Sequence, residues 1–319
     1  LAALHVERKG HEKKVFRIKD TAFFKKPLEV KLNQLGLSDE VFGFSAEMEA
    51  PANRKGTKAD FHVYIPESVE KVKAAFYISR HGMGDITKPV LKKFAEEENL
   101  ALIGMFGDPV QRGVDDVANL DVYIEKLAEM SGHPELVDAP IMTFGHSNGT
   151  GFAASYPRDR PERVIAWVGF HPGFNNYISF ENTDQVPAMI MCGEKDKYLL
   201  NARQDQEVAK LRKSRNAAMN IMMEGGVGHG PADADTTWTF ITEFLKAAMR
   251  TRLNEDGTLK PVEIENGWLG GQYELEKGGR QELEISPYAI YSGDPSSASW
   301  LPDEEFAQAW QKFGKQPAK

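Results

Sequence analysis

Cysteine is almost absent from this chain of 319 residues, which contains only Cys192. A single thiol excludes an internal disulfide, and no Cys/His cluster has zinc-ligand spacing, so we expect no metal site. Cys192 lies in the apolar run PAMIMCG, a context typical of a small buried side chain rather than a reactive thiol.

Basic charge and long apolar runs are also missing. The formal net charge of −8 argues against a nucleic-acid-binding protein, which normally carries a basic stripe. No run approaches the roughly 18 apolar residues of a membrane span. The glycine-rich stretch GGVGHG lacks the spacing of a nucleotide-binding loop. With 41% hydrophobic residues the chain is nevertheless too apolar to be disordered, so we expect a folded globular protein.

Apolar strands alternate with amphipathic helices from residue 41 onward. The first two strands, 41–50 and 59–67, are predicted to pair antiparallel across a turn-rich loop. Alternation of the later segments predicts a mostly parallel sheet with helices on both faces. Further strands are expected at 72–79, 100–106, 139–145, 163–170, 187–193 and 220–224, and helices at 87–99, 114–132, 149–157, 203–213 and 236–251.

Composition divides the chain into three parts. Residues 1–40 are charged and irregular and are interpreted as an N-terminal extension, and residues 41–252 form the strand–helix domain. Residues 253–319 are predicted to be an irregular C-terminal extension packed on that domain, because a segment of this size has too small a core to stand alone. The opening Leu-Ala-Ala-Leu is compatible with the end of a signal peptide, which favours a secreted or periplasmic location over a cytoplasmic one.

The sequence GHSNG places Ser147 between Gly145 and Gly149, directly after a predicted strand and before a predicted helix. This Gly-x-Ser-x-Gly spacing is the pattern of a nucleophile elbow, a strained turn that exposes a reactive serine. Side chains at the two glycines would clash with the adjacent strand or helix. Ser147 is therefore the predicted nucleophile.

A serine hydroxyl needs a base, a carboxylate to orient the base, and N–H donors for the oxyanion. Two carboxylates, Glu194 and Asp196, follow the strand 187–193, and His229 follows the strand 220–224. In a parallel sheet these strand ends lie at one edge. The chain order nucleophile, acid, histidine is that of a hydrolase triad, with either carboxylate as the acid.

The oxyanion hole requires two backbone N–H groups. The amide of Asn148, the residue after the nucleophile, is predicted to supply one. The loop SRHGMGD, after the strand 72–79, is predicted to supply the other through the Met83 amide, with Gly82 and Gly84 as neighbouring alternatives. Glycine in such a loop lets the backbone approach a substrate closely.

The motifs RHGMGD, GHSNG, GEKD and GHG together resemble the α/β-hydrolase superfamily. Within it, the region from about residue 41 to 251 is similar to serine esterases of the feruloyl esterase and polyhydroxybutyrate depolymerase kind. The resemblance implies an α/β-hydrolase fold, ester hydrolysis without a cofactor, and Asp196 rather than Glu194 as the acid. Serine at position 147 counts against dienelactone hydrolases, which use cysteine, and haloalkane dehalogenases, which use aspartate.

Only sixteen residues, 171–186, separate two of the predicted strands, too few for the large helical lid of many lipases. An open site favours carboxylic esters of small or plant-derived acyl groups, either as small molecules or linked to a polysaccharide. His171, Phe174 and Tyr177 lie in this segment and are predicted to contact the substrate, although Phe174 is equally suited to anchoring the loop on the core.

Two other functions remain open at this point. One is a peptidase of the prolyl-oligopeptidase type, disfavoured because 319 residues leave no room for the usual gating domain. The other is a hydrolase-like binding protein without turnover, disfavoured because such proteins generally lose a triad member. The oligomeric state is not predicted.

Overall fold

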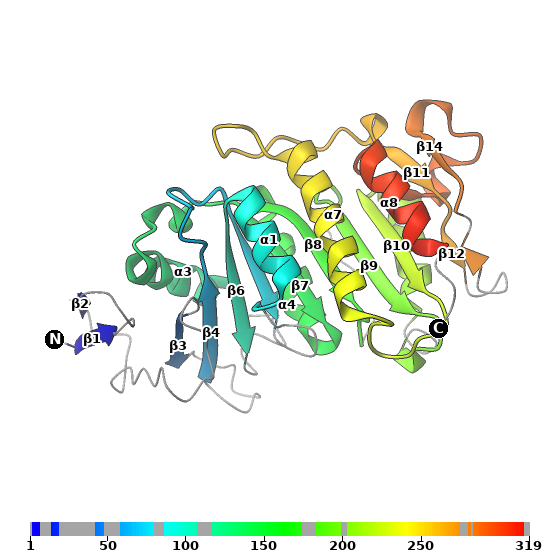
Figure 1. Cartoon of the computed structure of the whole chain (residues 1–319). Helices are drawn as coiled ribbons and strands as arrows, with labels where there is room; N and C mark the ends of the chain where they lie inside the picture. The colour runs from blue at the N-terminus through cyan, green and yellow to red at the C-terminus, as the bar shows by residue number, and fades with distance from the viewer. Residues whose placement is uncertain are drawn as a thin grey trace.

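A central eight-stranded sheet organises the molecule (Figure 1). The structure is a computed structural model that describes residues 2–6, 14–18, 42–47, 58–79, 86–106, 117–173, 183–198, 203–274, 280–281 and 283–315. The sheet order is β10-β9-β8-β7-β5-β6-β4-β3. Its strands are β3 (Phe42–Glu47), β4 (Lys58–Tyr64), β5 (Ala74–Ser79), β6 (Leu100–Phe106), β7 (Ile141–His146), β8 (Val164–Phe170), β9 (Ala188–Gly193) and β10 (Met219–Glu224).

The pairing within this sheet is mostly parallel. β4 runs antiparallel to both of its neighbours, β3 and β6, whereas every pair from β6 through β5, β7, β8 and β9 to β10 is parallel. The strands β5, β7, β8 and β9 are buried along their whole length. Continuous apolar runs suit strands that are covered on both faces. The strand pairing confirms the expected parallel sheet and the antiparallel first pair.

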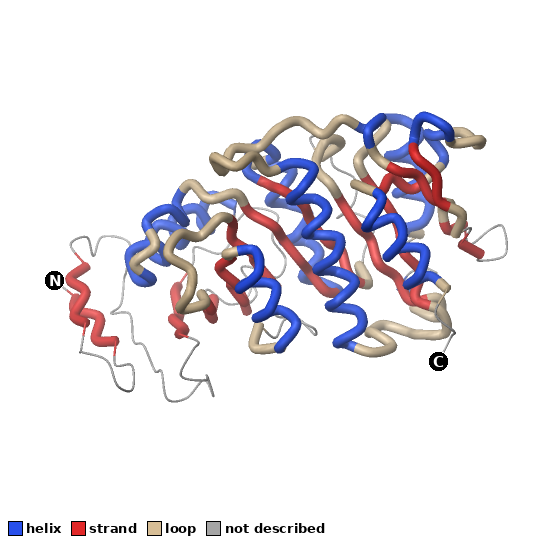
Figure 2. Tube along the Cα trace, turned by 45° about the horizontal axis from the view of Figure 1, so that its top comes forward, coloured by secondary structure: helices blue, strands red, loops and turns tan. Residues whose placement is uncertain are grey.

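Helices cover both faces of the sheet. On one face α1 (Pro89–Glu98), α7 (Ala234–Arg252) and α8 (Glu304–Gly314) share an apolar cluster with the strands. Figure 1 shows these three helices side by side in front of the sheet, and Figure 2 shows the same layer with the top of the molecule turned toward the viewer. On the other face α3 (Val117–Ser131), α4 (Thr150–Asp159) and α6 (Gln204–Arg215) contribute to a second cluster. The predicted class, a mostly parallel sheet flanked by helices, is confirmed.

The region after α7 has more regular structure than the irregular extension that the sequence suggested. Its strands are only two or three residues long, too short to show an alternating pattern. They are β11 (Trp268–Gly270), β14 (Ile285–Pro287) and β15 (Ser299–Leu301), which form a three-stranded antiparallel sheet, and the paired β12 (Tyr273–Glu274) and β13 (Arg280–Gln281).

Helix α8 begins after Asp303, whose side chain accepts the Phe306 N–H at 2.9 Å and caps the first turn. The Phe240 ring of α7 then stacks on Phe306 and Phe313 of α8, with centroids 5.5 and 4.2 Å apart. Across the sheet edge, the buried Arg212 guanidinium of α6 donates to the Ala298 carbonyl at 2.7 Å. The tail therefore packs on both α7 and α6.

The remaining elements are short. β1 and β2 form an antiparallel pair within the segment that was interpreted as an irregular N-terminal extension. No helix within the described ranges has the length and apolarity to cross a membrane. The short elements are β1 (Ala2–Val6), β2 (Lys14–Ile18) and the 3-10 helices η2 (Pro134–Val137), η3 (Ser147–Gly149), η4 (Pro161–Arg163), η6 (Ile264–Asn266), η8 (Tyr288–Ile290) and η9 (Pro295–Ser297).

Candidate active site

Ser147 occupies the turn between β7 and α4, in a backbone conformation that is unusual for its residue type. Its φ is +53°, a left-handed value that costs free energy for any residue with a Cβ. Gly145 explains how the turn closes: a Cβ there would lie 2.0 Å from the Gly149 carbonyl oxygen, which no real contact permits. The Thr150 hydroxyl also donates to the Gly145 carbonyl at 3.1 Å. The strained turn and the need for glycine at 145 are thus present as the sequence indicated.

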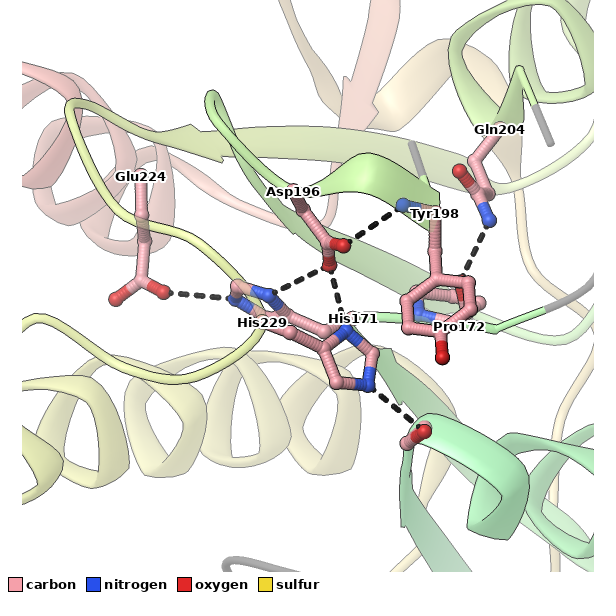
Figure 3. Close-up of polar contacts among 8 residues, drawn as sticks. His171, Pro172, Asp196, Tyr198, Gln204, Glu224 and His229 are labelled. Carbon is pink, nitrogen blue, oxygen red and sulfur yellow. Dashed lines mark hydrogen bonds and ion pairs between the residues drawn. The ribbon is translucent and has the colours of Figure 1, made fainter. Parts of the chain in front are cut away.

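His229 contacts Ser147 from the loop after β10. Its Nε2 lies 2.8 Å from Ser147 Oγ and its Nδ1 lies 2.8 Å from Asp196 Oδ2. With Nδ1 protonated, the imidazole donates to the carboxylate and accepts the serine proton through Nε2. Figure 3 shows His229 and Asp196 joined in this way. Three residues far apart in sequence therefore form one continuous hydrogen-bond chain.

Asp196, and not Glu194, faces the histidine. The Asp196 carboxylate is 1% exposed and accepts the Tyr198 N–H on Oδ1 at 2.9 Å. Burial raises the pKa of Asp196, but hydrogen bonds from His171, His229 and the Tyr198 amide outweigh it and bring the pKa down to about 2. Asp196 is therefore ionised at neutral pH. Glu194 turns away and accepts the Gly226 N–H at 2.8 Å at the surface.

The position of His171 corrects one expectation. The sequence suggested a substrate contact, but the ring is completely buried behind Asp196. Its Nδ1 lies 3.1 Å from Asp196 Oδ2 and its Nε2 lies 3.0 Å from Glu224 Oε2. Both ring nitrogens are engaged with carboxylates, so neither is available to a substrate. The residue follows β8 directly, and its φ of +45° turns the side chain beneath the loop that carries Asp196.

Two glycines set the spacing at this edge of the sheet. A Cβ on Gly193, the last residue of β9, would lie 2.1 Å from the Gly228 carbonyl oxygen. The loop that carries His229 can therefore pass directly over the strand that carries Asp196. A Cβ on Gly173 would lie 3.8 Å from Ser147 Oγ in ordinary contact, which places the Gly173 backbone beside the nucleophile.

The oxyanion donors are only partly within the described residues. Asn148 lies in the first turn after Ser147, within η3, so its amide is at the N-terminal end of a helical segment. Met83, predicted to supply the second amide, lies outside the described residues, as do Phe174 and Tyr177. Their roles remain predictions.

One group of potential metal ligands is found among the described residues: His171, Asp196 and His229, whose ligand atoms lie within 4.8 Å of one another. Both imidazole Nδ1 atoms already hydrogen-bond the same carboxylate oxygen, Asp196 Oδ2. A cation would have to displace both of these bonds. The arrangement therefore suits proton placement better than metal coordination.

The order along the chain is a serine on a strand-to-helix turn, an aspartate after β9 and a histidine after β10, all at the carboxyl edge of a parallel sheet. The chain has the α/β-hydrolase fold. Within this fold, the motif-bearing strand ends β7, β9 and β10 deliver the three side chains to one point.

Comparison with known proteins finds no matching family and no matching curated protein. Among solved structures, the chain is similar to an S-formylglutathione hydrolase from Agrobacterium tumefaciens (15% identity, 66% of this chain and 95% of that chain, TM-score 0.45). It is also similar to a ferulic acid esterase (14%, 66% and 98%, TM-score 0.46) and a poly(3-hydroxybutyrate) depolymerase from Bordetella parapertussis (16%, 64% and 87%, TM-score 0.41). Likenesses of this size do not decide the reaction, which has to be inferred from the site.

Sequence reasoning missed three residues that this α/β-hydrolase fold brings to the site. Glu224 ends the buried strand β10 and contacts His171, and Thr237 donates its hydroxyl to Glu224 at 2.8 Å. Tyr198 places its ring 4.6 Å from that of His229. The available sequence signal was for Glu224: it is a carboxylate at the end of the largely apolar strand β10, at the sheet edge that carries Asp196 and His229.

Proposed function

We propose that this chain is a serine hydrolase that cleaves carboxylic esters of small or plant-derived acyl groups. The observation that carries the proposal is the continuous hydrogen-bond chain from Ser147 Oγ through His229 to Asp196, with distances of 2.8 Å at both links. A base positioned on the hydroxyl and an ionised carboxylate behind the base are what a serine needs to become a nucleophile.

Acylation follows from this geometry. His229 Nε2 takes the Ser147 proton as Oγ attacks the ester carbonyl, and the resulting imidazolium donates through Nδ1 to Asp196. His229 then passes the proton to the departing alkoxide, which leaves as the alcohol, and an acyl-serine ester remains. Water repeats the sequence: His229 takes a proton from water, the hydroxide attacks the acyl group, and Ser147 leaves with the proton returned by His229.

The developing negative charge on the carbonyl oxygen needs N–H donors. We assign one donor to the Asn148 amide, which immediately follows the nucleophile at the start of a helical segment. We assign the second to the Met83 amide, on the sequence argument alone. Neither role requires a cofactor.

Three features support small or plant-derived acyl groups as substrates. The backbone of Gly173, without a side chain, lies beside Ser147, which leaves room next to the nucleophile. The His229 side chain is 29% exposed, so the base is reachable from solvent although Asp196 behind it is not. A short connection between β8 and β9 is consistent with an open entrance.

The test combines a fluorophosphonate probe with a ladder of p-nitrophenyl esters from acetate to decanoate, plus methyl ferulate. We expect the wild type to label and to hydrolyse short-chain esters or ferulate, and Ser147→Ala to lose both, with turnover reduced about 10⁴-fold or more. Ser155→Ala is the matched control, because Ser155 is also buried in this region but donates only to the Gly151 carbonyl; it should label like the wild type.

A wild-type protein that refuses the probe and hydrolyses none of the esters would overturn the proposal. Labelling together with a clear preference for decanoate would keep the serine hydrolase but contradict the acyl class. Labelling that persists in Ser147→Ala would show that another residue reacts.

A further inference from the structure

The carboxylate of Asp196 is shared between two histidines. Its Oδ2 lies 2.8 Å from His229 Nδ1 on the solvent side and 3.1 Å from His171 Nδ1 on the protein side. Behind His171 the contacts continue to Glu224 Oε2 at 3.0 Å, and Glu224 Oε1 accepts the Thr237 hydroxyl. Figure 3 shows this row from Glu224 through His171 and Asp196 to His229. An ordinary serine triad ends at its carboxylate, whereas this one continues inward by two residues.

The two acceptors around His171 determine its protonation. A neutral imidazole has one N–H donor and one bare nitrogen, so one of the two carboxylates would face a lone pair. With both ring nitrogens protonated, His171 donates to Asp196 and to Glu224 at once. Burial lowers the pKa of His171, but the hydrogen bonds and charges of the two carboxylates outweigh it and raise the pKa above its ordinary value.

The surroundings of His171 hold the ring in this place. The backbone N–H of His171 donates to the Met191 carbonyl at 2.8 Å. The side-chain amide of Gln204 donates to the carbonyl of the next residue, Pro172, at 2.7 Å. The charged groups that face it are Asp196 from the β9 loop and Glu224 from β10. The imidazoles of His229 and His146 lie 5.9 and 6.1 Å away between ring centroids. On β9, burial raises the pKa of the Cys192 thiol well above its usual range, which keeps it neutral.

We propose that His171 and Glu224 are positioning residues for the base of the reaction: Glu224 holds His171 as an imidazolium, and His171 orients Asp196 and offsets part of the negative charge that Asp196 presents to His229. The charge count supports this role. Asp196 and Glu224 contribute two negative charges and His171 one positive charge, so the buried group keeps a net charge of −1. This inference rests on the proposed function.

The decisive variant is Glu224→Gln, which removes the charge but can keep every hydrogen bond. The glutamine amide donates to Nε2 of a neutral His171, which still donates from Nδ1 to Asp196, and the amide oxygen still accepts from Thr237. The acidic limb of the kcat/KM profile reports the pKa of His229 in the free enzyme. Glu224→Gln removes the positive charge of His171, 5.9 Å from His229 between ring centroids, together with the more distant negative charge of Glu224, so that limb should move upward by about half a pH unit to one pH unit.

Two further readouts accompany this profile. KM should stay unchanged in Glu224→Gln, because the buried His171 touches no substrate. Thr237→Val is the matched control, since it deletes the hydroxyl on the far side of Glu224 but leaves the carboxylate charge; its acidic limb should coincide with that of the wild type. A folded Glu224→Gln protein with an unshifted limb would overturn the tuning role.

Nitrogen NMR of histidine-labelled protein tests the same inference without catalysis. As the pH is raised, one histidine of the wild type should keep both ring nitrogens protonated after the other histidines have lost theirs, and this signal should disappear in Glu224→Gln. Absence of an imidazolium signal in the wild type would overturn the charge assignment even if the variant does not fold. The wild type could also show the imidazolium signal but neither label with fluorophosphonate nor hydrolyse esters. That result would instead overturn the proposed function, and with it the tuning role.

Discussion

The carboxyl edge of the sheet and the seam between α7 and α8 are both buried, but different physics stabilises them. The seam consists of Phe240 and Phe244 from α7 and Phe306 and Phe313 from α8, whose rings contact one another with centroids 4.2 to 5.5 Å apart. The stability of the seam grows with the apolar area removed from water, and it does not depend on specific hydrogen-bond partners. The edge buries charge, which is stable only while each group keeps its hydrogen bonds.

Backbone conformation differs between the two regions as well. At the edge, Ser147 and His171 both have positive φ, whereas the seam is made of regular helix. Strain of this kind persists only where the surrounding structure holds it. A change at the edge should therefore mainly cost activity, and a change at the seam should mainly cost stability. The following predictions test this division.

The largest expected effect is at the edge. Asp196→Ala should reduce kcat by roughly 10⁴-fold, because the imidazole loses the partner that fixes its tautomer and stabilises its charged form. Glu194→Ala is the natural control, two residues away on the same loop: its carboxylate holds only the Gly226 N–H at the surface and should leave the rate within about threefold of wild type. Steady-state hydrolysis of a p-nitrophenyl ester measures both. Equal losses in the two variants would contradict the assignment of the acid.

At the seam the expected effect is on stability. Phe306→Ala removes a buried ring that contacts Phe240 and Phe244 and should lower the free energy of unfolding by about 3 to 5 kcal/mol. Below its unfolding transition the variant should hydrolyse esters at the wild-type rate. Urea unfolding and a rate assay at low temperature measure the two quantities. Ile290→Ala, at a side chain that is 74% exposed, should change stability by less than about 0.5 kcal/mol. A seam variant that is stable but inactive would contradict the expectation that changes at the seam cost stability rather than activity.

The smallest effect concerns acid. The folded pKa of Asp196, about 2, lies below its unfolded value near 3.9, so its ionised form stabilises the native state. That contribution, about 2 kcal/mol, is complete above about pH 4 and is lost as the pH falls toward 2. In urea unfolding from pH 5 down to 2.5, the stability difference between wild type and Asp196→Asn should therefore shrink. For Phe306→Ala the difference in unfolding free energy from the wild type should stay constant over this pH range. A constant difference for Asp196→Asn as well would argue against the lowered pKa of Asp196.

Much of this architecture is readable in the sequence because it is local. The strand predicted at 100–106 is β6 to the residue, and the predicted helix at 203–213 is α6 within two residues at its end. Glycine spacing located Ser147, and the apolar runs that end shortly before Asp196 and His229 located the other two residues of the hydrogen-bond chain. Each of these depends on a short window of residues in which period or turn chemistry is visible.

What the sequence concealed depends on how strands pair. The opposition of Glu224 and Gly193 follows from the parallel register of β9 and β10, which no local pattern reveals. His171 was noticed but assigned to the substrate, because nothing in its own segment shows that its positive φ turns the ring beneath Asp196. The small strands of the tail were missed because two or three residues carry no period.

Gly173 has a consequence for engineering. Among the described residues, an added methyl group at this position would meet the Asn148 amide oxygen and Ser147 Oγ at 3.7 and 3.8 Å, which is ordinary van der Waals contact. Gly173 contributes no group to the hydrogen-bond chain of Ser147, His229 and Asp196, although it borders the reacting atom. A mutant library confined to Gly173 would therefore be an economical starting point for directed evolution of acyl selectivity, since it alters what reaches Ser147 and leaves the groups that activate it in place.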